Sequence, residues 1–101
     1  MNARDAEMRK RIEDLVESVR DDQTRSHQLF QYVWSMMCVR RGLMRVLREV
    51  TTIDGRVQLL LEEVKTGQRR LVSRPEELDL EIEGLAVQAL ARMLATQSRV
   101  G

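Results

Sequence analysis

Aromatic side chains are scarce in this chain of 101 residues, which contains one Phe, one Tyr and one Trp. Its hydrophobic core must therefore be built mainly from Leu, Val, Ile and Ala, together with six Met. The three aromatic residues, Phe30, Tyr32 and Trp34, all lie within one window of five residues. Their clustering singles out one short segment in which large, flat side chains gather.

Cysteine, histidine and proline each occur once, as Cys38, His27 and Pro75. A single cysteine cannot form an intramolecular disulfide, which agrees with a reducing compartment. A zinc site around one His and one Cys would need at least two carboxylate ligands, and no spacing in the sequence indicates one. The five glycines form no phosphate-binding loop. We therefore expect a protein that is not an enzyme and that uses neither a metal nor a cofactor.

Long apolar runs are lacking as well. No segment approaches the roughly 18–20 uncharged apolar residues that a membrane-spanning helix needs, and the first ten residues are too charged for a signal peptide. We therefore expect a cytoplasmic protein without a membrane partner. With 43% hydrophobic and 33% charged residues, the chain is typical of one soluble domain spanning residues 1–101.

Charge is nearly balanced over the whole chain, at a net +1, but it is unevenly distributed. Residues 25–75 carry ten basic and four acidic side chains, whereas the two ends together carry seven basic and twelve acidic ones. The basic middle can neutralise the acidic ends across the folded surface, or it can face a polyanion.

Two helices are predicted in the first part of the chain. Residues 1–22 place apolar side chains at offsets of three and four, as in an amphipathic helix. The polar stretch DDQTRSHQ then favours a break, although without Gly or Pro a continuous helix stays open. Residues 24–41 predict a second helix, apolar nearly all round and hence buried on more than one side. Gly42 is a suitable residue to end it.

The segment after Gly42 has two interpretations. Apolar residues at helical spacing allow the second helix to continue to about residue 50, followed by one β-hairpin in a mostly α fold. The β-branched run of residues 50–53 and the turn dipeptide Asp54-Gly55 instead favour a strand, which we prefer. Two further strands around a turn at Gly67 then complete a three-stranded antiparallel meander within residues 43–74.

The last predicted element is a helix over residues 76–97. The sequence Ser73-Arg74-Pro75-Glu76 has the pattern of a capping box, with Pro early in the first turn. The predicted order is therefore α-α-β-β-β-α, a small α+β domain whose meander is covered by helices. Three consecutive leucines, 59–61, present apolar side chains on both faces of the middle strand. Both faces need cover, from helices of the same chain or from a second copy.

The second helix also carries the leading candidate for a binding surface. Phe30, Trp34, Met37 and Arg41 are spaced at i, i+4, i+7 and i+11, so they form one stripe. Trp and Arg are enriched at interface hot spots, and Met adapts to irregular partner surfaces. Tyr32 and Met36 lie on the other side of the helix and also need cover. The sequence thus predicts a self-associating interaction or adaptor module, a homodimer that forms through these six residues, with another protein as a further possible partner of the same surface.

The alternative function is nucleic-acid binding by the basic segment 40–74. Clustered cations are what phosphate contacts require, and aromatic rings can stack on bases. The candidate residues are Arg40, Arg41, Arg45, Arg48, Arg69, Arg70 and Arg74.

Overall fold

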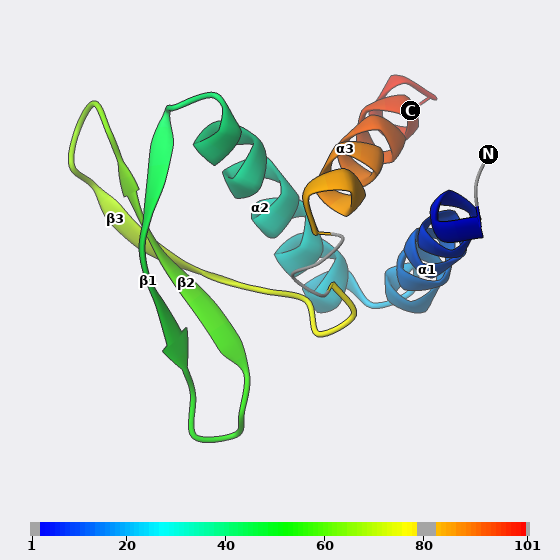
Figure 1. Ribbon diagram of the computed structural model, residues 1–101, viewed down its shortest axis with the longest axis horizontal. Helices are drawn as coiled ribbons and strands as arrows, with labels where there is room; N and C mark the ends of the chain where they lie inside the picture. The colour runs from blue at the N-terminus through cyan, green and yellow to red at the C-terminus, as the bar shows by residue number, and fades with distance from the viewer. Residues whose placement is uncertain (1–2, 79–82, 101) are drawn as a thin grey trace.

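The computed structural model describes residues 3–78 and 83–100 and confirms the order α-α-β-β-β-α (Figure 1). The strands form one antiparallel sheet in the order β1-β2-β3. The alternative of a helix continuing to about residue 50 is wrong, because the chain is in a strand by Met44. The elements are α1 (Ala3–Val19), α2 (Gln23–Arg40), β1 (Met44–Thr51), β2 (Val57–Glu63), β3 (Arg69–Ser73) and α3 (Glu83–Val100).

Local capping explains where α2 begins and ends. The side chain of Asp22 accepts a hydrogen bond from the backbone N–H of Arg25 at 3.1 Å, so Asp22 is the N-cap of α2. The polar stretch therefore separates α1 from α2. At the other end, Gly42 has a φ of 76°, a conformation that other residues rarely adopt. The chain therefore turns out of the helix and into β1, as the glycine predicted.

The connection between β1 and β2 differs from the two-residue turn that Asp54-Gly55 suggests. The backbone N–H of Thr52 donates to the carbonyl of Arg56 at 2.8 Å, which leaves three residues in the loop. The N–H of Gly55 donates to the carbonyl of Thr52 at 2.9 Å, and Gly55 has a φ of 85°. A turn followed by a glycine in the left-handed conformation is the usual three-residue hairpin loop.

The predicted capping box at Ser73 is wrong. Ser73 is the last residue of β3 and pairs with Gln58, and the next backbone N–H, that of Arg74, donates to the carbonyl of Val57 at 2.9 Å. These sheet hydrogen bonds hold the chain extended where the helix was expected to begin. The chain then makes one turn that buries Leu78, and α3 is described from Glu83. The predicted helical residues 79–82 lie outside the described part of the chain.

The molecule is layered, with the sheet on one side of α2 and with α1 and α3 on the other (Figure 1). Helix α2 packs against β1 and β3 and also against the two other helices. Its fully buried Tyr32 lies in the same core as Leu61 of β2 and Leu90 of α3, all at 0% exposure. The meander is covered by helices as predicted, and among the described residues they cover the face that carries Leu59, Leu61 and Val72 and leave the opposite face open.

Candidate interaction surfaces

Two large aromatic side chains of α2 are exposed. Phe30 is 50% and Trp34 is 57% exposed, and they lie one helical turn apart on the same face. Arg41 is also exposed and Met37 is half-buried, so the predicted stripe is a continuous strip of accessible surface. We call Phe30, Trp34, Met37 and Arg41 the α2 stripe. Phe30 and Trp34 give this strip its aromatic part.

Tyr32 and Met36 do not belong to that surface. Tyr32 is completely buried and Met36 is half-buried against the core cluster. The argument that these two residues require a partner for cover is therefore wrong, because α1, α3 and the sheet enclose that side of α2.

The ends of α2 carry opposite charges. Asp21 and Asp22 are exposed at its N-terminal end, and Arg40 and Arg41 are exposed at its C-terminal end. With 18 residues, the helix is about 27 Å long at a rise of about 1.5 Å per residue. The α2 stripe therefore runs between an acidic end and a basic end.

The uncovered face of the sheet is the second accessible surface. Directly paired residues share a face, so the pairs Arg48↔Leu60 and Leu60↔Leu71 place these three side chains together, opposite the helices. Glu62 lies on the same face between two arginines. The Nε of Arg45 donates to its Oε1 at 2.9 Å, and the Nε of Arg69 donates to its Oε2 at 3.1 Å. These hydrogen bonds, that of Arg45 first, lower the pKa of Glu62, so it stays a carboxylate and offsets part of the positive charge.

The arginines proposed for nucleic-acid binding are not all brought together. Arg45, Arg48 and Arg69 share the uncovered sheet face. Arg70 lies on the helix-facing side, where its Nη2 is 3.3 Å from the Sδ of Met44. The tip of Arg40 lies against Gly84 at the start of α3, and Arg41 belongs to the α2 stripe.

Arg74 is removed from the surface. Its side chain is only 13% exposed, with Nη1 at 3.4 Å from a carboxylate oxygen of Glu49 and Nε at 3.8 Å from Glu83. Burial raises the pKa of Glu83. Phosphate contact by Arg74 would require it to leave both carboxylates.

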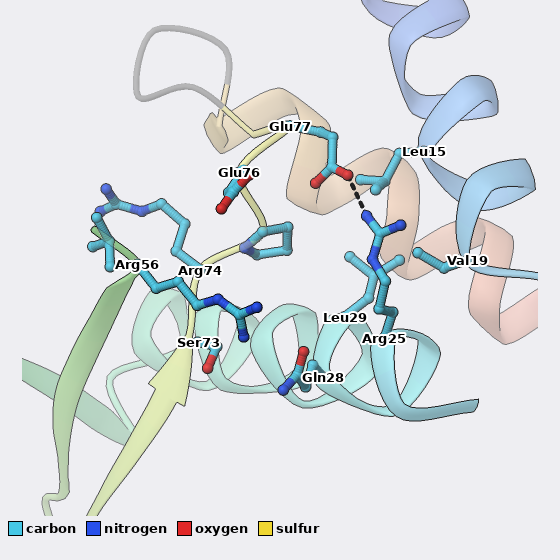
Figure 2. Close-up of a pocket in the computed structure, with 12 residues that line it drawn as sticks. Leu15, Val19, Arg25, Gln28, Leu29, Arg56, Ser73, Arg74, Glu76 and Glu77 are labelled. Carbon is cyan, nitrogen blue, oxygen red and sulfur yellow. Dashed lines mark hydrogen bonds and ion pairs between the residues drawn. The ribbon is translucent and has the colours of Figure 1, made fainter. Parts of the chain in front are cut away.

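A cavity of about 360 Å³ lies between α1, the first turns of α2 and the segment that follows β3 (Figure 2). Three arginines line it, Arg25, Arg56 and Arg74, together with Ser73 and Gln28. Figure 2 shows Arg25 and Glu77 pointing toward each other across it, joined by an ion pair. Sequence reasoning missed this site because its arginines come from three separate segments, and no spacing along the chain signals that they meet.

Other classes of site were sought in the described part of the chain. It holds no group of three or more His, Cys, Asp or Glu side chains placed to bind a metal ion. No helix there is both long and apolar enough to cross a membrane. In comparisons with known proteins, no family model, curated protein or solved structure matches this chain.

Proposed function

We propose that this protein is a self-associating interaction module that binds a second copy of itself through the α2 stripe. The observation that carries the proposal is the pair of half-exposed aromatic side chains, Phe30 and Trp34, on a helix whose other sides are packed in the core. Large aromatic side chains at the centre of an interface contribute most of its binding energy. A chain with three aromatic residues that leaves two of them accessible has an anchor suited to this role.

Charge favours a second copy as the occupant of this surface. In an antiparallel pair of α2 helices, a two-fold axis between residues 30 and 34 sets Phe30 of one copy against Trp34 of the partner subunit. The acidic end at Asp21 and Asp22 then lies beside the basic end at Arg40 and Arg41. In this arrangement the surface is complementary to itself in charge.

Sedimentation equilibrium over the micromolar range tests the dimer. We expect Trp34→Ala to weaken it by about 2 kcal/mol or more, or roughly 30-fold in the dissociation constant. Leu71→Ala is the matched control, because Leu71 is 52% exposed but lies on the uncovered sheet face. A wild-type protein that stays monomeric throughout refutes the proposal. So does a dimer that is sensitive to Leu71→Ala and insensitive to Trp34→Ala.

The antiparallel arrangement has its own test. Arg41→Glu brings two acidic ends together and weakens the dimer, whereas the double variant with Asp21→Arg restores it. Asp21 is chosen over Asp22 because Asp22 caps the helix. Failure of the double variant to recover rejects the antiparallel pairing.

Nucleic-acid binding is a second candidate function, favoured by the strand register that gathers Arg45, Arg48 and Arg69 on one uncovered face. Such contacts give an affinity that falls steeply with salt concentration. A labelled RNA and a labelled DNA duplex are titrated at low salt against wild type and against Arg48→Gln with Arg69→Gln. Binding lost in the double variant supports this function, and no binding by the wild-type protein refutes it.

A further inference from the structure

The cavity beside the first turns of α2 has the dimensions and the mixed lining of a small-molecule site. Its volume of about 360 Å³ falls in the range of ligand pockets, about 300–1,000 Å³. Leu15 and Val19 of α1 and Leu29 of α2 provide an apolar wall (Figure 2). Val57 and Pro75 also line the cavity, and its remaining side chains are polar or charged, so the cavity offers both apolar and polar surface.

Positive charge is concentrated in its lining. Arg25 comes from α2, Arg56 from the β1–β2 connection and Arg74 from the residue after β3. Three guanidinium groups around one cavity repel each other unless negative charge lies between or beside them. Each of these arginines already has a carboxylate partner: Glu77 for Arg25, Asp54 for Arg56, and Glu49 and Glu83 for Arg74.

Arg74 is already held by two carboxylates, Glu49 and Glu83. Its Nε is buried and has no hydrogen-bond partner among the described residues, and Glu83 lies 3.8 Å away, beyond hydrogen-bond distance. The buried Oε1 of Glu83 has no hydrogen-bond partner either, so these two groups pair with each other, and this N–H is not a donor open to a ligand.

Arg25 is held by an exchangeable partner. It forms an ion pair with Glu77, and the two side chains are 43% and 39% exposed. An ion pair this accessible to water contributes little to stability, so a stronger acceptor can replace the carboxylate at low cost. Arg56 is held in the same way, by an ion pair with Asp54 at 3.3 Å in which the two side chains are 67% and 63% exposed.

We propose that this cavity binds a small organic anion, with a carboxylate or phosphate head held by Arg25 and Arg56 and an apolar body against Leu15 and Leu29. The Ser73 hydroxyl and the Gln28 amide are further donors in the lining. Guanidinium groups suit both head groups because their paired N–H donors match two oxygens at once. The site is separate from the α2 stripe, so it does not depend on the proposed self-association.

The test uses three naphthalene derivatives that differ in the head group: naphthyl phosphate, naphthoate and the uncharged naphthalenemethanol. Binding is measured by calorimetry with the full chain. We expect saturable binding of one or both anions at one site per chain, and none of the alcohol. Whichever anion binds more tightly identifies the preferred head group.

Variants assign that binding to the cavity. Arg56→Gln removes a side chain that is 67% exposed, so the fold tolerates it, and it should weaken binding at least about tenfold. Arg48→Gln is the matched control, because it removes an exposed arginine from the uncovered sheet face, and it should bind like wild type. Trp34→Ala should also bind like wild type, which excludes the α2 stripe as the site.

Four outcomes overturn the proposal. One is that neither anion binds saturably, and another is that the alcohol binds as tightly as the anions. The third is that Arg56→Gln and Arg25→Gln both leave affinity unchanged. A loss caused by Trp34→Ala alone moves the binding to the α2 stripe and equally overturns the assignment.

Discussion

Replacement of Tyr32 by Phe should stabilise the protein, although Tyr32 is a fully buried core residue. Its ring is at 0% exposure, and its hydroxyl oxygen has no hydrogen-bond partner among the described residues. Folding therefore strips this hydroxyl of water without giving it another partner. Such a group costs about 1–3 kcal/mol in a folded protein.

The substitution leaves the ring in place and removes one oxygen atom. The void it opens is no larger than a water-sized sphere of about 15 Å³, which at about 24 cal/mol per Å³ costs about 0.4 kcal/mol. The net gain expected for Tyr32→Phe is therefore about 1–2 kcal/mol. For a domain of this size, each kcal/mol raises the melting temperature by about 4–8 °C.

Urea denaturation followed by circular dichroism measures this gain, with all variants at one protein concentration because self-association also adds to apparent stability. Tyr32→Ala is the comparison, since it removes the ring and should lower the free energy of unfolding by about 3–5 kcal/mol. A Tyr32→Phe protein less stable than wild type by more than about 0.5 kcal/mol refutes the reasoning. The hydroxyl would then be satisfied, for example by a buried water.

Two further predictions address the helix packing and the sheet. On α3, Leu90→Ala should lower the free energy of unfolding by about 2–5 kcal/mol, because Leu90 is at 0% exposure. Leu85→Ala should change it by no more than about 0.5 kcal/mol, because Leu85 is 54% exposed. Equal losses of the two variants in urea denaturation would contradict the orientation of α3. Arg45 and Arg69 lower the pKa of Glu62, so its contribution to stability is complete above the ordinary value of 4.5 and is lost as the pH falls through the lower pKa of the folded state. Glu62→Gln should flatten the decline in melting temperature at acid pH, and an unchanged acid profile would contradict the role of this carboxylate.

The sequence predicted the place of a turn where one residue type favours one backbone conformation. Gly42 needed a positive φ, and the chain turned there from α2 into β1. The hairpin loop was predicted at Gly55 but with the wrong length. The Thr52 hydroxyl accepts a hydrogen bond from the backbone N–H of Arg56 at 3.1 Å and extends the loop to three residues. That contact spans four residues and is not part of the dipeptide signal.

Tertiary contacts decided the features that the sequence could not fix. Ser73 and Glu76 have the spacing of a capping box, yet the sheet hydrogen bond from Arg74 to Val57 keeps the chain extended at that point. The cavity depends in the same way on long-range contacts, because Arg25 and Glu77 are 52 positions apart in sequence. The hydrophobic periodicity of a sequence does not show which residues so far apart come into contact.

The aromatic residues of α2 show what a helical pattern of apolar residues can predict and what it cannot. A helix that is apolar nearly all round predicts burial on several sides, and Tyr32 is buried as that pattern requires. The pattern cannot say which side stays open, because that depends on where the sheet and α3 pack. Burying a large apolar side chain stabilises a fold by about 1.5–3 kcal/mol, so a small domain with three aromatic residues gains by enclosing all of them. This chain leaves Phe30 and Trp34 half exposed. An interface that buried these two side chains would gain the stabilisation that the monomer lacks, and this is the physical reason for proposing that α2 carries the binding surface.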